Sequence, residues 1–484
     1  MKKEVRHAVH SNTRSLDQGA VPSSLIDRIF SVISQQILTG VLPPGGRLPS
    51  VRQLAVDHQV SNETAHRAYD KLVARGYVEP RRGSGFYVKA VAPSVCDSRS
   101  LRWAKDADTA HDWRNLLRSE LPYERRPGCG SLPDAWMDQA ALSNALRSMG
   151  RVNPRALAEY ETVRGYLPLR QQLQIKLAEQ GIGAQPDQIV TAAGATEAVH
   201  LVLWSHVNYP GSYVLMEDPA PAMHIQRALA CGLEIARVPR DSDGPDIDVL
   251  RAMCEKYKPR VFFCSSILQN PTSTSLSPHK AFQILKLADE FDLSIIDDDT
   301  YGDLLPPADA NHVTRLATLD QLKRVIHIGS FSKTLAPGLR VGFIAASPQH
   351  VERILLFKAA GLISGSTLGE RVVYQFLSQG KYRHHCESLR SRLLEIREKT
   401  MAQLAAAGCS FPTPATAGMY LWGSLGDETN ASVIADAMTA QDYLVAPGSF
   451  FSYADPARSC MRFNIAATCN SPAVAVLSTL IHGK

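Results

Sequence analysis

The chain has 484 residues, 45% hydrophobic and 20% charged, which excludes general disorder and predicts roughly three domains at about 150 residues each. No apolar run reaches the ~20 residues that a membrane helix needs, and Met1–Arg14 lacks the hydrophobic region of a signal peptide. Nine cysteines without a CxxC pair favour reduced thiols over disulfides or a zinc site. We therefore expect a cytoplasmic protein with no bound metal.

The net charge of +5 is distributed unevenly along the chain. Residues 1–90 contain 13 basic and 7 acidic side chains, whereas the other 394 residues contain 39 and 40. A small basic module on a near-neutral body indicates a polyanion as the partner of that module. The alternative is chance clustering of charge on a solvated face.

Three helices are predicted after a polar N-terminal arm, residues 1–22, which lacks apolar periodicity and is expected to be flexible. Apolar residues from Leu25 to Leu38 recur at helical spacing and stop before the turn at residues 43–46. Ser50 is placed to cap a helix over residues 51–58, and Ser61 to cap another that ends near Arg75. Two helices about three residues apart match the helix-turn-helix pattern.

A basic hairpin is predicted directly after the last of these three helices. Residues 77–80 and 85–88 read as its strands, and Arg81, Arg82, Gly83 and Ser84 lie between them. This places two arginines at the tip of a wing. Helix, turn, helix and basic wing together predict a winged helix-turn-helix DNA-binding domain over residues 23–89. For Arg52, Arg81 and Arg82, plain surface charge is the alternative.

The run LPSVRQLAVDHQVSNETAHRAYDKLVARGYVEPRRGSGFYV resembles the DNA-binding domain of GntR-type bacterial transcription regulators throughout its length. The resemblance implies that the helix beginning at Ser61 enters the major groove. The residues it would offer to bases and phosphates are Ser61, Asn62, Glu63, Thr64 and His66. The residues that would grip the backbone and the minor groove are Arg52, Arg82 and Gly83. Relatives often have arginine at positions 62 or 66, where this chain has asparagine and histidine.

The remaining chain alternates short apolar runs with helical stretches, after a linker over residues 90–120. Helices are expected at residues 197–206 and 278–291, and a small α+β segment at about 385–484. This alternation predicts a mostly parallel sheet covered by helices. The predicted strands are residues 189–193, 213–217, 260–264, 293–297, 325–329 and 340–346.

Five polar motifs stand at expected strand ends, where open α/β sheets bind ligands. They are Thr191–Ala198, Gln269–Thr272, Ile295–Tyr301, Gly329–Arg340 and Met461–Asn464. Taken singly, each has a plainer structural explanation, such as an ordinary turn before a helix.

The chemistry of these motifs is complementary. The helix start after Gly194 suits a phosphate, because its backbone N–H groups are free. The carboxylates of residues 297–299 crowd each other and need a cationic partner, for which a protonated pyridine nitrogen would serve. Lys333, between two serines, suits a Schiff-base nucleophile, and Arg340 suits a phosphate. Arg462, inside an apolar strand, is placed to receive a substrate carboxylate.

The order of all five motifs resembles the fold-type-I aminotransferases that use pyridoxal 5′-phosphate (PLP), over residues 155–470. The resemblance implies that Lys333 forms the internal aldimine, that Asp298 pairs with the pyridinium nitrogen, and that Asn270 and Tyr301 contact the 3-oxygen. Arg462 would bind the carboxylate of an effector. The implied phosphate contacts are Gly194, Ala195, Thr196, Ser330 and Arg340, together with Tyr160, which would reach the phosphate of a partner subunit.

One position departs from that family's pattern. Where relatives usually stack an aromatic residue on the cofactor ring, this chain has Pro221. His224 is a candidate to replace the missing aromatic. Without such support the ring can tilt, and we expect transamination to be slow.

A GntR-like domain joined to an aminotransferase-like domain is the plan of the MocR subfamily of bacterial regulators. We therefore predict a homodimeric, PLP-dependent transcription regulator that binds operator DNA and senses an amino acid, an amine or PLP at Lys333. The predicted organisation is an arm (1–22), a mostly α winged helix-turn-helix (23–89), a linker (90–120) and an α/β PLP-binding domain with a small C-terminal α+β subdomain (121–484). The alternatives are a true aminotransferase with an autoregulatory DNA-binding module, and a DNA-binding protein whose large domain only dimerises.

Overall fold

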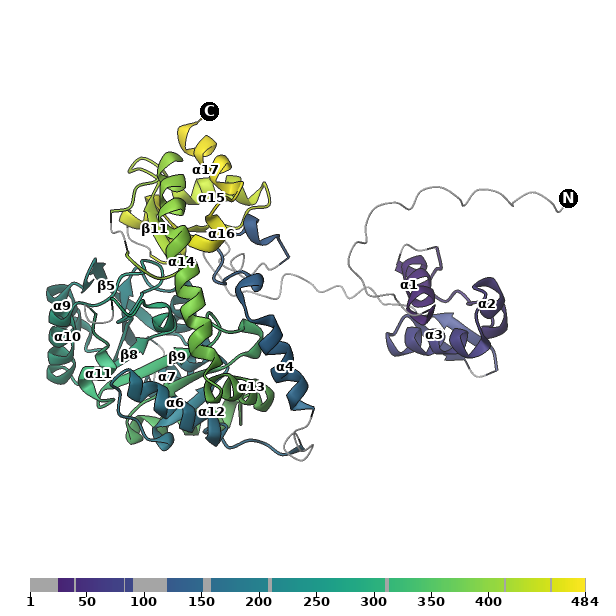
Figure 1. Ribbon diagram of the computed structural model, residues 1–484, viewed down its shortest axis with the longest axis horizontal. Coiled ribbons are helices and arrows are strands. Elements are labelled where there is room, and N and C mark those ends of the chain that lie inside the picture. Colours follow the sequence, from purple (N-terminus) through teal and green to yellow (C-terminus); the bar gives the residue numbers. More distant parts are fainter. Residues whose placement is uncertain are drawn as a thin grey trace. The chain divides into compact units, whose positions relative to one another are not determined.

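The chain forms two compact units, Met1–Ala107 and Asp108–Lys484. The computed structural model (Figure 1) describes residues 25–38, 41–81, 83–89, 120–150, 158–207, 211–309, 313–412, 415–452 and 455–483. The predicted arm, Arg82 and all but the last residue of the predicted linker lie outside these ranges.

The smaller unit contains the predicted three helices and hairpin. Its elements are α1 (Leu25–Leu38), α2 (Val51–Asp57), α3 (Asn62–Ala74), β1 (Val78–Arg81) and β2 (Gly85–Val88). The apolar stripe of α1 packs on α3 through Ile29, Ile33 and the fully buried Tyr69. The Tyr69 hydroxyl donates a hydrogen bond of 2.7 Å to the Pro49 carbonyl, which ties α3 to the start of α2.

Both predicted helix caps are present, and the wing differs slightly from expectation. Ser50 Oγ accepts from Gln53 N at 3.2 Å, and Ser61 Oγ accepts from Thr64 N at 3.1 Å. β1 and β2 pair antiparallel, but Arg81 belongs to β1, opposite Gly85, and not to the tip. Its guanidinium lies over the Tyr87 ring at 4.4 Å and pairs with Glu79 at 2.9 Å, because both side chains are in reach on the same hairpin.

The larger unit is built on an eight-stranded sheet of order β3-β10-β9-β8-β7-β4-β5-β6. Strands β4, β5, β7, β8 and β9 are parallel, whereas β10 is antiparallel to β3 and β9, and β6 to β5. Its strands are β3 (Ile189–Ala192), β4 (Tyr213–Asp218), β5 (Glu234–Asp241), β6 (Gly244–Pro245), β7 (Val261–Cys264), β8 (Ser294–Asp298), β9 (Val325–Ser330) and β10 (Gly342–Ala345).

The six predicted strands are all present, and two more, β5 and β6, were not predicted. One boundary was wrong: Arg340 adopts a left-handed conformation with φ 52°, and the strand begins two residues later at Gly342.

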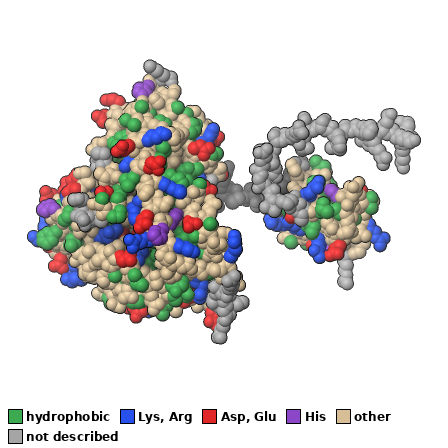
Figure 2. Space-filling model, viewed as in Figure 1, with side chains coloured by type: hydrophobic (Ala, Val, Ile, Leu, Met, Phe, Trp, Pro, Cys, Tyr) green, Lys and Arg blue, Asp and Glu red, His purple; other side chains and the backbone are tan. Residues whose placement is uncertain are grey.

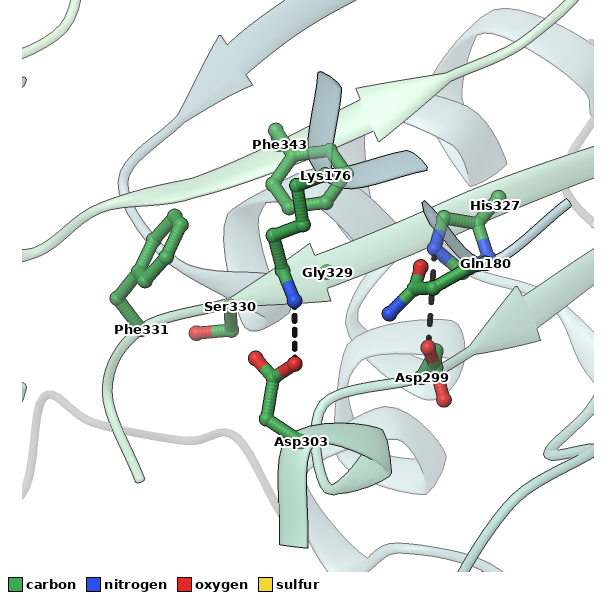
Figure 3. A pocket seen from close by; sticks show the side chains of 9 residues that line it. All are labelled: Lys176, Gln180, Asp299, Asp303, His327, Gly329, Ser330, Phe331 and Phe343. Atoms are coloured by element: carbon green, nitrogen blue, oxygen red, sulfur yellow. Dashed lines mark hydrogen bonds and ion pairs between the residues drawn. The ribbon is translucent and has the colours of Figure 1, made fainter. Parts of the chain in front are cut away.

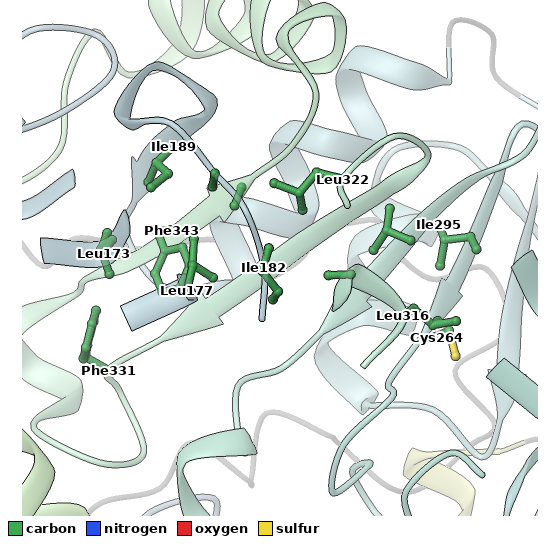
Figure 4. Close-up of a cluster of buried hydrophobic side chains, with 14 of the residues drawn as sticks. Leu173, Leu177, Ile182, Ile189, Cys264, Ile295, Leu316, Leu322, Phe331 and Phe343 are labelled. Carbon is green, nitrogen blue, oxygen red and sulfur yellow. The ribbon is translucent and has the colours of Figure 1, made fainter. Parts of the chain in front are cut away.

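Helices cover both faces of this sheet (Figure 1). Ile295 and Ile296 of β8 point to opposite faces and enter two different hydrophobic clusters, as the alternation of side chains along a strand requires. Figure 4 shows part of the first cluster, in which Leu173 and Leu177 pack near Phe343. The helices are α4 (Gln139–Met149), α6 (Leu167–Glu179), α7 (Ala195–His206), α8 (Ala222–Ala230), α9 (Ile247–Tyr257), α10 (Pro278–Glu290), α11 (Leu316–Asp320), α12 (Pro348–Gly361) and α13 (Thr367–Ser378).

A smaller α+β subdomain completes this unit, as predicted. The long helix α14 leads into it (Figure 1), and its sheet has the antiparallel order β11-β13-β12. Its elements are α14 (Lys381–Ala406), β11 (Tyr420–Ser424), α15 (Ala431–Thr439), β12 (Ala446–Pro447), β13 (Cys460–Asn464), α16 (Ile465–Thr468) and α17 (Ala473–His482). Within the described part of the chain, no helix is long and apolar enough to cross a membrane.

Candidate functional site

The predicted site residues of the larger unit follow strands whose carboxyl ends meet at one edge of the sheet. Asp298 ends β8, Ser330 ends β9, Gly194 follows β3 and Asn270 follows β7. This is the edge at which open α/β sheets bind ligands.

Lys333 lies in the turn after β9, beside a segment that precedes α4. Its Nζ donates a hydrogen bond of 2.6 Å to the Gly130 carbonyl oxygen, and it forms no ion pair with any described residue. A Cβ on Gly130 would lie 3.2 Å from that Nζ and 3.5 Å from the Tyr420 hydroxyl. Glycine at position 130 therefore keeps the space around the amine open.

The residues predicted to bind a 3-oxygen and a carboxylate form one hydrogen-bonded chain. Asn270 Nδ2 donates to the Tyr301 hydroxyl at 3.4 Å, and the Tyr301 and Tyr420 hydroxyls are 3.2 Å apart. Arg462 donates from one guanidinium nitrogen to Asn270 Oδ1 at 2.9 Å. Burial and the neighbouring Tyr420 raise the pKa of Tyr301 well above its ordinary value, so its hydroxyl remains protonated.

Arg462 is a buried cation, only 4% exposed, without a carboxylate partner among the described residues. Its other terminal nitrogen donates to the Gly128 carbonyl at 2.7 Å, and its Nε has no hydrogen-bond partner within the described ranges. The guanidinium lies over the rings of Tyr420 and Phe451, at 4.3 and 4.8 Å from their centres. A buried arginine that has an unused hydrogen-bond donor and no carboxylate partner among the described residues is suited to bind an incoming carboxylate.

Asp298 is held as a carboxylate at the end of β8. Its Oδ2 lies 3.0 Å from His224 Nε2, and its Oδ1 accepts from Thr300 N at 3.1 Å. Burial raises the pKa of Asp298, but the hydrogen bonds from His224 and Thr300 outweigh burial and leave the pKa below its ordinary value. A buried carboxylate in this state suits a cationic partner such as a protonated ring nitrogen.

The predicted phosphate contacts gather where β3 turns into α7. Gly194 has φ 89°, and a Cβ there would lie 3.0 Å from an Arg340 guanidinium nitrogen. Arg340 donates to the Ala193 carbonyl at 2.5 Å, and Ala195 and Thr196 open α7. Ser330 belongs to the same region, since it pairs with Gly342, whose own Cβ position lies 2.8 Å from the Gly194 backbone.

The smaller unit presents the start of α3 with its polar side chains partly engaged. Asn62 is exposed, Glu63 pairs with Arg67 at 2.7 Å, and His66 pairs with Asp70 at 2.9 Å. The side chains of Ser61 and Thr64 contact each other at 2.9 Å within the cap. Arg52 is exposed, and Gly83 has φ 75°, which a wing tip requires.

The comparisons with known proteins agree with these two units. Residues 127–479 match the family "Aminotransferase class I and II", and residues 25–88 match "Bacterial regulatory proteins, gntR family". The HTH-type transcriptional regulator YdcR of Escherichia coli (strain K12) is 28% identical over 90% of this chain and 93% of its own length. The probable rhizopine catabolism regulatory protein MocR of Rhizobium meliloti is 26% identical over 78% of this chain and 76% of its own.

The chain belongs to the aminotransferase class I and II family and has the MocR-type architecture.

Solved structures support the fold of the larger unit of this MocR-type chain. A multiple substrate aminotransferase from Thermococcus profundus superimposes with a TM-score of 0.69 at 22% identity, over 79% of this chain and 96% of that one. LysN, an α-aminoadipate aminotransferase of Thermus thermophilus complexed with N-(5′-phosphopyridoxyl)-L-leucine, gives 0.66 at 24%, over 76% and 94%. The predicted fold class, a winged helix-turn-helix plus a fold-type-I aminotransferase domain, is confirmed.

The residues of this MocR-type chain fit the PLP that its family implies. Arg462 Nε, Ser332 Oγ and His224 Nδ1 are buried polar atoms without a hydrogen-bond partner among the described residues. The Gly194 turn, where no Cβ takes up space beside Arg340, is the kind of cradle that a phosphate needs. Asp298 supplies the negative charge that a protonated ring nitrogen needs.

Sequence reasoning missed three features of the site. Gly128 and Gly130 supply carbonyl acceptors to Arg462 and Lys333, and the only local signal was the sequence Pro-Gly-Cys-Gly at residues 127–130. Tyr420 was missed, although alternation in its strand puts it on the same face as Trp422, which is paired with Arg462. His224 was considered only as a stacking residue; the structure pairs it with Asp298 and packs its ring 4.7 Å from that of Phe263.

Two predicted site residues, Tyr160 and Arg82, are not placed at a site by the described part of the chain. Tyr160 is 81% exposed, so its predicted contact with a partner subunit remains a prediction. Arg82 lies outside the described residues.

The three successive carboxylates at the end of β8 each contact a different partner. Asp297 bonds to Ser266, Asp298 to His224, and Asp299 to Arg315 at 3.0 Å. Figure 3 shows Asp299 and His327, 3.9 Å apart, beside a cavity of about 10 Å³ that Ser330 also lines. That cavity has room for about one water, so it is not the effector site.

Asp297 gives a pH prediction. Burial and the charge of Asp299 raise the pKa of Asp297 to about 7, so the folded chain holds this proton more tightly than the unfolded chain. The contribution of Asp297 to stability is therefore full below about pH 4 and is lost as pH rises to about 7. Asn keeps an acceptor for Ser266 but does not ionise, so we expect Asp297→Asn to abolish this loss.

The measurement is the free energy of unfolding in urea at several pH values between about 4 and 8, compared with the parent chain. Asp427→Asn, at an exposed position, serves as the control and should follow the parent. If Asp297→Asn also parallels the parent over that range, the assigned ionisation of Asp297 is wrong.

Proposed function

We propose that this chain is a PLP-dependent transcription regulator that binds operator DNA through residues 23–89 and senses an amino acid, an amine or PLP at Lys333. The observation that carries the proposal is that Lys333 and Arg462 hydrogen-bond to the same short segment, at Gly130 and Gly128. An amine site and a carboxylate site thereby share one structural element, in a chain that also has a DNA-binding domain.

The proposed cofactor contacts are those that the resemblance to fold-type-I aminotransferases implies, and the geometry above supports them. Lys333 would bind PLP covalently, Asp298 would pair with the ring nitrogen, and Asn270 and Tyr301 would hydrogen-bond to the 3-oxygen. When bound, PLP supplies an aldehyde carbon that condenses reversibly with primary amines. The residues that would hold the phosphate are Gly194, Ala195, Thr196, Ser330 and Arg340, with Tyr160 contributed by a partner subunit in a homodimer.

The signal would start from the two hydrogen bonds to residues 128–130. Once Lys333 Nζ is engaged by the cofactor, its bond to the Gly130 carbonyl is lost. A carboxylate bound at Arg462 competes with the Gly128 carbonyl for the same guanidinium nitrogen. Binding of PLP and of a carboxylate therefore loosens this segment, whereas an effector amine that displaces Lys333 would let its amine return to the Gly130 carbonyl. The segment lies a few residues after the predicted linker, so the linker is the path by which the DNA-binding domain would respond.

The competing function is genuine transamination. The complete set of Lys333, Asp298, Tyr301 and Arg462 favours it, because the same residues serve an enzyme. A sensor needs a bound state that persists, whereas a transaminase needs rapid proton transfer by the displaced Lys333 amine. With Pro221 in place of a ring aromatic, alignment is poorer, and a misplacement of about 1 Å costs on the order of a hundredfold in rate.

The experiment that tests the proposal combines absorbance and DNA binding. Protein loaded with PLP is titrated with a panel of amino acids and amines, and the affinity for a DNA fragment carrying the operator is measured in parallel. We expect a spectral change and a DNA-affinity change at the same ligand concentration. Sustained turnover at about 1–1000 per second with no effect on DNA binding would instead identify an aminotransferase.

The DNA interface is tested by two classes of substitution. Arg52→Ala should weaken binding to all sequences and lower the salt dependence by about one unit of slope, since it removes one phosphate contact. Asn62→Ala should instead change sequence preference by about 1–3 kcal/mol at one base pair.

Arg75→Ala, at the other end of α3, is the matched control. Unchanged affinity and preference in both test variants, in gel shifts from low to high salt, would remove this face from the interface. The predicted contact of Arg82 is tested in the same series.

A further inference from the structure

A second cavity lies at the edge of the sheet opposite to Lys333. It has a volume of about 310 Å³ and is formed where β7, β8 and β9 begin, between the end of α7 and the start of α12. Because β9 has six residues at about 3.3 Å each, this cavity is about 20 Å from the Lys333 edge. It is therefore a separate site and not an extension of the first.

The lining of this cavity is strongly basic. Arg260, Lys323, Arg324 and Arg353 reach it from three different segments of the chain, and Asp292 is the acidic residue among its lining side chains. Arg324 is already neutralised, by Asp292 at 2.8 Å and Asp289 at 3.2 Å.

The other three cations, Arg260, Lys323 and Arg353, have no ion-pair partner among the described residues, and all three are exposed. Three positive charges around one cavity repel one another, and an anion bound in the cavity would relieve that repulsion.

Two histidines form one wall of the cavity. His206 Nε2 lies 2.6 Å from His350 Nδ1, and both residues line the hollow. His206 Nδ1 lies 3.0 Å from the Val202 carbonyl and 2.8 Å from Ser205 Oγ, and the Ser205 hydroxyl donates its own hydrogen to that carbonyl at 3.0 Å. Nδ1 therefore carries a hydrogen, and Nε2 accepts from His350 Nδ1. The neutral His350 is left with Nε2 as an acceptor, which suits the P–OH group of a partly protonated diphosphate.

The electrostatic environment agrees with this arrangement. Burial lowers the pKa of His206 to about 4, with contributions from His350 and Arg353. Burial likewise lowers the pKa of His350; Arg353 and Arg324 add to the effect, and Asp320 opposes it. Both imidazoles are thus neutral near pH 7, and the charge in the hollow comes from arginine and lysine.

We propose that this cavity binds a small anion with two or more negative charges on phosphate groups, such as a diphosphate or a phosphate ester. Arginine binds phosphate oxygens in a two-pronged manner, and the volume lies at the lower end of small-molecule sites. The start of α12 adds its partial positive charge at Gln349 and His350. Residues 91–484 carry 39 basic and 40 acidic side chains, so the body as a whole does not attract a long polyanion. Figure 2 shows basic and acidic side chains interspersed on the visible face of the larger unit.

The test uses the full chain saturated with PLP, so that the phosphate contacts near Gly194 are occupied. Inorganic pyrophosphate is titrated by calorimetry at about 0.15 M NaCl, into the parent and into a triple variant with Arg260→Ala, Lys323→Ala and Arg353→Ala. We expect one saturable site in the parent and at least tenfold weaker binding in the variant. The variant should fold, because the three side chains are exposed, and an unchanged melting temperature checks this.

Arg383→Ala with Lys399→Ala, two exposed cations on α14, is the matched control and should bind like the parent. Absence of saturable binding in the parent overturns the proposal, and so does equal binding by parent and triple variant. A random DNA duplex is titrated in a second arm. If the triple variant loses affinity for the duplex while pyrophosphate does not bind the parent, the face contacts DNA backbone and the small-anion site is rejected.

Discussion

Lys333→Ala is expected to abolish the visible absorbance of the PLP-loaded chain, at about 400–430 nm, together with its trapping by borohydride. The Lys333 Nζ is engaged by a neutral carbonyl, Gly130 O, and by no described carboxylate, whereas the buried Lys358 amine near the phosphate turn is bonded to the Thr191 carbonyl. Loss of that one hydrogen bond costs about 1 kcal/mol of stability, so the variant should fold. The measurements are absorbance and mass spectrometry after borohydride treatment.

The same variant separates sensing from DNA binding. Its affinity for operator DNA without effector should equal that of the PLP-loaded parent, because neither has the Lys333–Gly130 hydrogen bond, whereas the change of affinity with effector should disappear. Lys399→Ala, at an exposed position on α14, is the control and should keep the absorbance and the response. A borohydride-stable adduct of equal yield in Lys333→Ala would mean that another lysine carries the cofactor.

Local sequence patterns were sufficient to predict most of the fold, for physical reasons visible in particular elements. The run Val261–Cys264 is completely buried between two layers of helices, so an uninterrupted apolar stretch marks it as a strand. β5 was missed because it is partly exposed, so that the charged Arg237 and Arg240 and Pro239 interrupt its apolar pattern. Caps at Ser50 and Ser61 were predictable because capping depends on residues only three positions apart.

The candidate site was predictable as a set of residues but not as a set of contacts. Lys333 and Gly130 are 203 positions apart, and Arg462 and Gly128 are 334 apart. No local pattern encodes such pairs, since they form only when segments distant in the sequence pack together. The pairing of His224 with Asp298, 74 positions apart, was missed for the same reason.

In Arg462→Gln, we expect the apparent affinity for carboxylate-bearing effectors to fall by about a hundredfold or more. The response to amines without a carboxylate should remain. The two terminal nitrogens of Arg462 now donate to neutral oxygens, of Asn270 and Gly128, and its Nε is unsatisfied among the described residues. A carboxylate would gain a charge-assisted, two-pronged interaction worth about 3 kcal/mol, and glutamine has no charge with which to form it.

The measurement pairs L-amino acids with the amines that correspond to them without the carboxylate, using the cofactor absorbance and the DNA affinity as two readouts. Arg462→Lys keeps the positive charge but not the planar, two-pronged guanidinium. It should therefore restore part of the discrimination between amino acids and the corresponding amines. Arg383→Gln, at an exposed position on α14, is the matched control. Because Arg462 also holds Asn270 beside Tyr301, a purely structural role would weaken the response to amino acids and amines equally. Equal weakening, with cofactor absorbance reduced to the same extent, would therefore contradict carboxylate recognition by Arg462.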